Sequence, residues 1–286
     1  MGSMPLRKLG SAELQAGAIG MGCMPFSVQG RPPEEQGIEA IHAAWEQGVT
    51  LFDTADAYCL DDSETGHNER VIAKALRGRE GAVVATKGGH VRPGGRWEVD
   101  GRPSHLRSAC EASLRALGVE AISLYQFHRP DPKVPFAESV GAVADLQRAG
   151  KVVHIGLSNV SVAQLEEARR IATIVSVQNR MNLFDDSSLD VLRRCEALGI
   201  AFLPYSPLNG MGRAGKIGGN RTLADIAAAH GASPQQVALA WLLQLSPVVL
   251  PIPGASKARN IVDCAGAPRL RLSAEEMERL GALASA

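Results

Sequence analysis

A repeating unit limits the fold of this chain more than any other feature of its sequence. Each unit is a short apolar run, a loop, an amphipathic segment and a glycine. The apolar runs are continuous or nearly so, which is typical of strands covered on both faces. They span residues 49–52, 83–86, 122–127, 152–157, 174–177, 200–204 and 248–252, with a weaker, glycine-rich run at 18–22. No low-complexity linker interrupts the series, so we predict a single domain.

The amphipathic segments have the spacing of helices. Ile38, Ile41 and Trp45 recur at helical intervals before Gly48, a favoured residue just past a helix end. Similar patterns end at Gly118, Gly150 and Gly199. Helix starts are indicated by the capping boxes Ser161-x-x-Gln164 and Ser273-x-x-Glu276 and by Pro234 at a first-turn position.

Eight strands that alternate with helices indicate a parallel α/β sheet, either closed into a barrel or doubly wound. The count of eight and the length of 286 residues favour a (β/α)8 TIM barrel, which we place at residues 6–286 with a short N-terminal β-hairpin. Residues 1–5 are interpreted as a cloning remnant and an unstructured start.

The composition narrows the possible partners and the compartment. Thirty basic residues balance thirty acidic ones, so we expect neither nucleic acid nor an anionic membrane as a partner. The five cysteines are odd in number and contain no CxxC pair, which favours reduced thiols and a cytoplasmic location. The most apolar stretch, 237–253, contains Gln244, Pro247 and Pro251 and is interpreted as a helix, a turn and a strand. A monomer is the default expectation.

Polar residues stand at the carboxyl ends of six successive runs. In a barrel these ends face one mouth, where barrel enzymes carry out their chemistry. Any one of these residues is more simply explained as a contact with solvent or a loop, but the set combines complementary chemical groups. It consists of Asp53, Lys87, His128, Ser158-Asn159, Gln178 and Tyr205.

These residue types suit the reduction of a carbonyl group without a metal. Hydride addition leaves negative charge on the oxygen, so a proton donor must stand within hydrogen-bond reach. Tyr58, five residues after Asp53, could be that donor if the cation of Lys87 lowers the pKa of its phenol. Asp53 would hold the ammonium in place, and His128 would polarise and orient the carbonyl.

With these residues the chain resembles the aldo-keto reductase family from about Leu6 to the C-terminus. The motifs of the family occur in the expected order and at compatible spacings. The matching pieces are Phe52-Asp53-Thr54-Ala55-Asp56-Ala57-Tyr58, Asn68-Glu69, Ala85-Thr86-Lys87-Gly88, Gln126-Phe127-His128, Gly150-Lys151, Gly156-Leu157-Ser158-Asn159, Gln178-Asn179, Pro204-Tyr205-Ser206-Pro207-Leu208 and Ile252-Pro253-Gly254. Arg129-Pro130-Asp131 after the histidine is similar to bacterial-type members.

This resemblance implies an NADPH-dependent oxidoreductase that reduces small aldehydes or ketones. It implies a catalytic tetrad of Asp53, Tyr58, Lys87 and His128, with Tyr58 as general acid. It implies that Ser158, Asn159 and Gln178 contact the carboxamide of the cofactor and that Tyr205 contacts the nicotinamide ring. It implies pyrophosphate contacts from Ser206, Leu208 and Gly210 and a further cofactor contact from Gly254, in the last matching piece. Around the 2′-phosphate it implies Ser256, Lys257 and Asn260.

The sequence departs from the family pattern near the adenosine. Cys264 stands where many relatives have Asn, and Asn260 stands where many have Arg. Lys257 and Arg259 still offer positive charge for a phosphate, so we expect NADPH in preference to NADH.

Other signals carry less weight. Gly210-x-Gly212-x-x-Gly215 matches a dinucleotide fingerprint but lacks its βαβ context, and is interpreted as a loop over the cofactor. The histidines show no metal-ligand spacing, so we expect no metal. The loop 88–101 either folds over the substrate or is a mobile surface loop. From position alone, Met24, Phe26 and Trp97 are candidates for an apolar substrate pocket.

Two other functions stay open at the level of sequence. The chain could be a regulatory or sensor barrel that binds NADPH with little turnover, although such a protein has no need of Tyr58. It could also be a phosphate-handling isomerase or lyase that uses no nicotinamide. The substrate and the role of Cys59, either an inert neighbour of Tyr58 or a redox-sensitive thiol, are not determined by the sequence.

Overall fold

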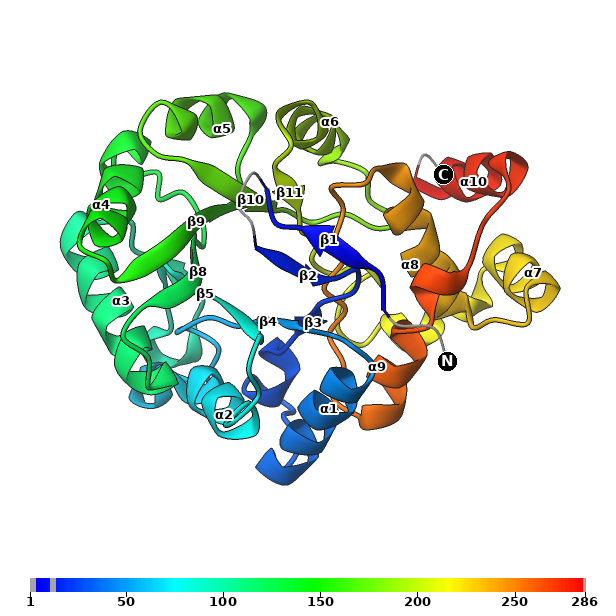
Figure 1. Cartoon of the computed structure of the whole chain (residues 1–286), viewed down its shortest axis with the longest axis horizontal. Coiled ribbons are helices and arrows are strands. Elements are labelled where there is room, and N and C mark those ends of the chain that lie inside the picture. The colour runs from blue at the N-terminus through cyan, green and yellow to red at the C-terminus, as the bar shows by residue number, and fades with distance from the viewer. Residues whose placement is uncertain (1–3, 11–13, 285–286) are drawn as a thin grey trace.

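The computed structural model describes residues 4–10 and 14–284. Within them, seven parallel strands form one sheet in the order β11-β10-β9-β8-β5-β4-β3, which curls around a centre (Figure 1). The strands are β3 (Met21–Gly22), β4 (Leu51–Asp53), β5 (Val83–Gly88), β8 (Ile122–Phe127), β9 (Val152–Ser158), β10 (Ile174–Gln178) and β11 (Ala201–Phe202). Neighbouring strands join through crossover helices, as parallel pairing requires.

The eighth predicted strand, 248–252, closes the ring of strands, but its hydrogen-bonded ladder is interrupted. It makes isolated parallel bridges, Phe202↔Val249 and Gly22↔Gly254, in place of a continuous ladder. The reason is that prolines at 251 and 253 have no N–H to donate, so the edge toward β3 receives hydrogen bonds only at carbonyl oxygens. The bonds are Leu250 N to Phe202 O (2.9 Å), Ile252 N to Pro204 O (3.3 Å), Gly20 N to Pro251 O (3.0 Å) and Gly22 N to Pro253 O (3.0 Å).

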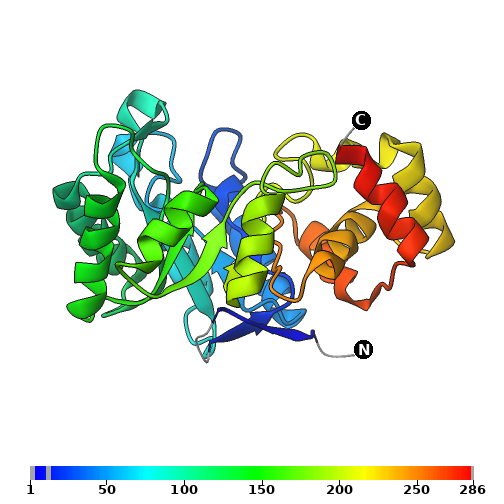
Figure 2. The same ribbon diagram turned by 90° about the horizontal axis from the view of Figure 1, so that it is seen from above.

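Helices surround the strands and give the predicted (β/α)8 barrel (Figure 1). Those that follow the strands in turn are α1 (Glu34–Glu46), α2 (His67–Ala75), α3 (Pro103–Leu117), α4 (Phe136–Arg148), α5 (Val162–Arg169), α6 (Leu189–Leu198), α8 (Pro234–Leu245) and α9 (Ala258–Cys264). Outside this alternation, α7 (Arg221–Ala229) and α10 (Ala274–Gly281) lie side by side at the edge of the molecule (Figure 2). His230 and Glu276 join them at 2.9 Å. No helix of the described residues has both the length and the apolar content needed to cross a membrane.

The helix boundaries follow the signals expected from the sequence. Capping boxes at Ser161 and Ser273 begin α5 and α10, and a third at Ser233 places Pro234 in the first turn of α8. Gly118 and Gly199 end α3 and α6 with φ of +68° and +64°, a conformation in which a side chain would be strained.

The N-terminal hairpin, β1 (Leu6–Lys8) with β2 (Gln15–Gly17), lies across the end of the barrel away from the long loops (Figure 2). The Arg7 guanidinium donates to the Leu243 and Ser246 carbonyls at 2.8 Å and to the Val249 carbonyl. Met4 packs on the core, and the Pro5 carbonyl accepts from Ala18 at 2.8 Å. These two residues of the predicted unstructured start therefore contact the domain, whereas residues 1–3 lie outside the described residues.

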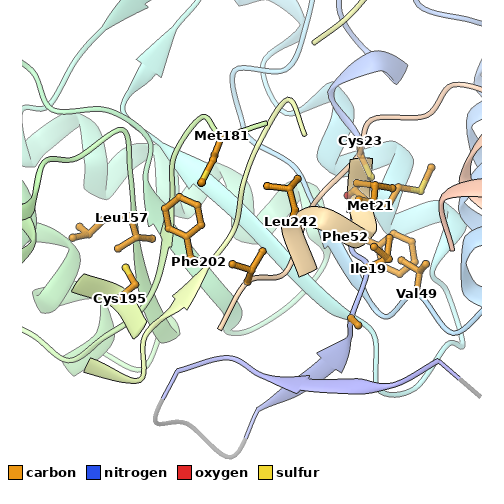
Figure 3. Packing of buried hydrophobic residues seen from close by; sticks show 14 of the residues in the cluster. Ile19, Met21, Cys23, Val49, Phe52, Leu157, Met181, Cys195, Phe202 and Leu242 are labelled. Carbon is orange, nitrogen blue, oxygen red and sulfur yellow. Dashed lines mark hydrogen bonds between the residues drawn. The ribbon is translucent and has the colours of Figure 1, made fainter. Parts of the chain in front are cut away.

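Apolar side chains fill the barrel on both sides of the strands. Leu9 and Ala16 of the hairpin segment join Leu51, Leu124 and Leu250 in the inner cluster, so that end is plugged. The larger cluster lies between the strands and the helices, where Phe52, Leu157 and Phe202 are fully buried (Figure 3). Strands packed on both faces hold their ends rigidly, so side chains at the open mouth have fixed positions.

Candidate active site

The polar residues predicted at the strand ends converge on one cavity of about 1040 Å³ at the open mouth of the barrel. The cavity has the size expected of a site for a cofactor and a small substrate. Predicted site residues that line it are Met24, Asp53, Tyr58, Trp97, His128, Ser158, Asn159, Gln178, Tyr205, Ser206, Leu208, Gly210, Gly254, Ser256 and Asn260.

Three predicted residues do not line the cavity. Lys87 lies fully buried beneath it. Lys257 is exposed at the N-cap of α9. Phe26 corrects the sequence prediction: it is 3% exposed, and its ring packs against Gly37 of α1, where a Cβ would come within 3.1 Å. Met24 and Phe26 share a 3₁₀ turn, in which residues two apart point in different directions, so one reaches the cavity and the other the core.

The buried ammonium of Lys87 is the centre of the site. Its Nζ lies 2.8 and 2.7 Å from the two carboxylate oxygens of Asp53, and it donates to the Thr54 carbonyl (2.8 Å) and Tyr58 Oη (3.2 Å). Burial alone would lower the pKa of Lys87, but Asp53 and Tyr58 together raise it. Lys87 is therefore a charged, fully hydrogen-bonded group at neutral pH.

The bond between Lys87 and Tyr58 sets the direction of the phenolic hydrogen. An ammonium can only donate, so the oxygen of Tyr58 is the acceptor. The three N–H groups of Lys87 are directed to Asp53, Thr54 and Tyr58. The hydrogen of Tyr58 is then free to be donated, and Tyr58 lines the cavity.

The acidity of Tyr58 differs from the sequence prediction. Burial raises the pKa of this phenol to about 12, and the opposing effect of the Lys87 cation is smaller. The prediction that Lys87 lowers this pKa below 10 is wrong because burial of the phenol has the largest effect on its pKa, and Asp53, which also raises it, opposes the cation.

His128 stands beside Tyr58, with ring centroids 5.7 Å apart and rings nearly perpendicular. Burial, and then the positive charge of Lys87, hold the pKa of His128 well below its usual range, so the imidazole is neutral at pH 7. Its Nδ1 is buried without a hydrogen-bond partner in the described residues. The arrangement suits a neutral ring that donates from Nε2 into the cavity.

Amide side chains connect the tetrad to the next strand ends. Gln178 Nε2 donates to Asp53 Oδ1 at 2.7 Å. Asn159 donates to the His128 carbonyl at 3.0 Å and accepts from Tyr205 Oη at 2.9 Å. Asn159 and Ser206 hold positive φ angles of +59° and +52°, which are uncommon for residues with side chains and tend to occur at functional sites. These bonds fix the Tyr205 ring at the cavity wall.

The loop 88–101 folds over the cavity, which answers a question that the sequence left open. Its short strands β6 (His90–Val91) and β7 (Glu98–Val99) form a hairpin, and His90, Trp97, Glu98 and Val99 line the cavity. The buried Arg92 holds this hairpin in place. It donates to the carbonyls of Cys59 (2.6 Å), Leu60 (2.9 Å) and Gly95 (2.7 Å), and its guanidinium lies 4.0 Å from the Trp97 ring centroid.

Two residues at the start of α2 support the tetrad from behind. Thr54 donates to Asn68 Oδ1 at 2.7 Å, and Thr86 donates to Glu69 Oε1 at 2.6 Å. Each threonine adjoins a tetrad residue, Asp53 or Lys87, so α2 fixes the ends of β4 and β5. Asn68-Glu69 is one of the pieces that resemble the family, but its structural role could not be predicted from the sequence, because the contact depends on the packing of α2 over the strands.

Three residues that line the cavity were not predicted from the sequence. They are Gln29, Gly30 and Lys133, and no pattern in the sequence connects them with the site. The described residues contain no group of three or more His, Cys, Asp or Glu side chains placed to hold a metal ion.

Cys59 is buried, and burial raises the pKa of its thiol to about 11, which disfavours a reactive thiolate.

Comparisons with known proteins agree with this geometry. The model of the "Aldo/keto reductase family" matches residues 18–285. The chain is 37% identical over 268 residues to the uncharacterized oxidoreductase C215.11c of Schizosaccharomyces pombe, covering 92% of this chain and 85% of that protein. It is similar to the thermostable aldo-keto reductase Tm1743, solved with the inhibitor epalrestat (TM-score 0.83, 31% identity, 98% of this chain and 100% of that one). It is also similar to an aldo-keto reductase of Klebsiella pneumoniae in complex with NADPH (TM-score 0.81, 26% identity, 97% and 94%).

Proposed function

The chain belongs to the aldo/keto reductase family, and we propose that it is an NADPH-dependent oxidoreductase that reduces the carbonyl group of small aldehydes or ketones to alcohols, with Tyr58 as the general acid. The observation that carries this proposal is the bond from the buried Lys87 ammonium to Tyr58 Oη, which leaves the phenolic hydrogen to be donated into the cavity beside His128.

The residues along one side of the cavity fit a nicotinamide dinucleotide. Gln178 Oε1 has no donor within residues 4–10 and 14–284, so it could accept from a carboxamide N–H, with Ser158 and Asn159 next to it. Tyr205 offers a ring of fixed position. Ser206, Leu208 and Gly210 would contact the pyrophosphate, followed by Gly254, Ser256 and Asn260. When bound, NADPH supplies the hydride.

We propose NADPH and not NADH because cations stand near the adenosine end of this side. Lys257 and Arg259 lie in the chain between Ser256 and Asn260, both of which line the cavity. Charge-assisted hydrogen bonds from such side chains favour a 2′-phosphate over a hydroxyl. The Klebsiella pneumoniae relative, solved with NADPH, supports the same choice.

In the proposed mechanism the substrate carbonyl oxygen lies between Tyr58 and His128. His128, neutral at pH 7, donates a hydrogen bond from Nε2 and orients the carbonyl. Tyr58 donates its proton to the oxygen as negative charge develops there. Lys87 stabilises the resulting phenolate, because its ammonium already contacts Tyr58 Oη, and Asp53 keeps the ammonium in place.

A phenol with a pKa of about 12 is still strong enough for this step. The proton acceptor is an alkoxide, whose conjugate acid is about as weak as water, with a pKa of about 15.7. Proton transfer from Tyr58 to the alkoxide is therefore favourable. The raised pKa also keeps Tyr58 protonated throughout the neutral range, so every molecule carries the proton that the reaction needs.

We also propose a cytoplasmic location and a monomeric protein. The five cysteines are free and buried, as expected for a protein of a reducing compartment.

The test is the oxidation of NADPH with a panel of aldehydes by wild type and Tyr58→Phe. The phenylalanine keeps the ring and removes the acid, so turnover should fall about 10²–10⁴-fold while NADPH still binds. Tyr125→Phe is the matched control, because Tyr125 is buried at 0% exposure and its Oη has no partner in the described residues. It should keep wild-type turnover.

Either of two outcomes would contradict the proposal. Wild-type turnover by Tyr58→Phe would remove Tyr58 from the mechanism. Tight NADPH binding by the wild type, with negligible turnover across the panel, would favour a sensor that binds the cofactor without using it.

A further inference from the structure

The charged side chains that line the cavity are unequally paired. Asp53 is matched by Lys87, and Glu98 is matched by Arg96 at 3.0 Å. Arg129 and Lys133 line the same cavity, and their side chains make no ion pair or hydrogen bond with any described residue. Within the described part of the chain, the cavity therefore carries two positive charges without a protein counter-charge.

The local structure explains why these cations are left unpaired. Asp131, which lies between them, is 7% exposed and accepts from the backbone N–H groups of Gly101 and Lys133, both at 2.9 Å. Its carboxylate is used to hold the loop after β8 against the 88–101 loop. The two neighbouring side chains, Arg129 and Lys133, are both exposed and border the cavity.

The position of these cations separates them from the proposed phosphate contacts of the cofactor. Arg129 directly follows His128 at the end of β8, the fourth strand of the sheet counted from either end. The segments 206–212 and 254–260 follow β11 and the closing strand, across the barrel from β8 (Figure 1). The phosphates therefore do not account for Arg129 and Lys133, whose loop is bonded through Asp131 to Gly101, next to the hairpin that carries Trp97 and Val99.

We propose that the substrate carries an anionic group, a carboxylate or a phosphate, in addition to its carbonyl, and that Arg129 and Lys133 bind that group. This inference rests on the proposed function, since it places the carbonyl beside His128 and Tyr58. Met24, Trp97 and Val99 line the same cavity, and the Trp97 ring lies 6.3 Å from the Tyr58 ring, so we expect the part of the substrate that joins carbonyl to anion to be apolar.

The chemistry of the two side chains suits this role. A guanidinium offers paired donors that match a carboxylate or phosphate, and a lysine ammonium adds a second charge that is less particular about geometry. The two histidines that line the cavity in the described part of the chain, His90 and His128, are not cationic partners at neutral pH, because burial is the largest cause of their lowered pKa values. The positive charge of Arg129 contributes in a smaller way to the lowered pKa of both imidazoles, so its guanidinium lies within electrostatic reach of His90 and His128.

Matched substrates test the inference directly. The rate constant kcat/KM for 4-carboxybenzaldehyde should exceed that for its methyl ester, which has the same body without the charge. The expected ratio at low salt is about tenfold or more, as for a lost charge-assisted hydrogen bond, and it should shrink at high salt. Glyceraldehyde 3-phosphate against glyceraldehyde distinguishes phosphate from carboxylate recognition.

Variants show whether the two named cations are responsible. Arg129→Gln and Lys133→Gln should each reduce kcat/KM for the acid, and the double variant should bring it to the level of the ester. The kcat/KM for the ester should fall far less than that for the acid in all three variants. Arg115→Gln is the matched control, because Arg115 is an exposed arginine on α3 that does not line the cavity. It should change neither rate.

A binding measurement separates failure of this inference from failure of the proposed function. Titration calorimetry with 4-methylbenzoate and with its methyl ester needs no turnover. If the wild type reduces no aldehyde but binds 4-methylbenzoate in a manner lost in the double variant, Arg129 and Lys133 form an anion site and the proposed function fails. If acid and ester react and bind equally, or if the double variant weakens both equally, the anionic substrate is wrong.

Discussion

Replacing Lys87 by methionine should destabilise the protein strongly, because it leaves Asp53 charged and buried without its cation. Lys87 is 0% exposed and Asp53 3% exposed, and the ammonium contacts both carboxylate oxygens. Removing one partner of a buried ion pair costs about 3–5 kcal/mol. Asp53 keeps hydrogen bonds from Gln178 (2.7 Å) and Gln126 (3.3 Å), so we expect the lower end of that range.

A loss of about 3 kcal/mol is large for a protein whose total free energy of unfolding is on the order of 5–15 kcal/mol. It corresponds to a fall in Tm of roughly 6–12 °C for a chain of this size. Urea denaturation followed by circular dichroism, without cofactor, measures the free energy of unfolding directly. The double variant Asp53→Asn/Lys87→Met removes the isolated charge, so it should be more stable than Lys87→Met while remaining as inactive.

The control is a salt bridge of similar length at the surface. Lys74 and Glu34 are 2.6 Å apart, but their side chains are 59% and 38% exposed. Lys74→Met should change the free energy of unfolding far less than Lys87→Met, because water solvates the carboxylate left behind. The reasoning is refuted if the two variants lose equal stability, or if the double variant is less stable than Lys87→Met.

Two further predictions concern the rate. First, kcat for reduction should not change between about pH 6 and pH 9. The pKa of Tyr58 is near 12 and that of His128 is well below its usual range, so neither group titrates near neutrality. Alcohol oxidation, which needs the phenolate, should rise over the same range, and a break in the reduction profile near pH 7–8 would count against both assignments. Arg92→Met should free Trp97 and raise KM by about tenfold, with a smaller change in kcat. The reason is that the lost bonds hold the hairpin and not the tetrad. In steady-state kinetics, a fall in kcat with no change in KM would contradict this prediction.

The barrel itself could be predicted because the signals for it are local. Apolar runs, glycines past helix ends and serine caps each depend on a few neighbouring residues, and Ser161, Ser273 and Gly118 have the predicted conformations. The closing strand shows the limit of such signals. Its apolar pattern was recognised, but Pro251 and Pro253 leave the edge toward β3 without donors, so only isolated bridges form.

The strand-end residues of the site could be predicted for a related reason. A barrel brings all carboxyl ends of its strands to one mouth, so Asp53, His128 and Gln178 meet whatever the details of the loops. Residues carried by loops were less predictable. The turn that sends Phe26 into the core and the use of Asp131 as a backbone acceptor depend on tertiary contacts that no spacing reveals.

The acidity of Tyr58 shows why naming the residues of a candidate site does not yet give their electrostatics. A lysine beside a tyrosine suggests a lowered pKa for the phenol, but burial of the phenol raises its pKa by more, and the carboxylate that holds the lysine also opposes the effect of the cation. These side chains therefore keep Tyr58 protonated near pH 7, and in the proposed mechanism Tyr58 releases its proton to a stronger base, the forming alkoxide. In that mechanism the contribution of Lys87 is greatest after the transfer, when the phenolate that it contacts is charged, so we expect its catalytic effect in the transition state and not in the resting acid.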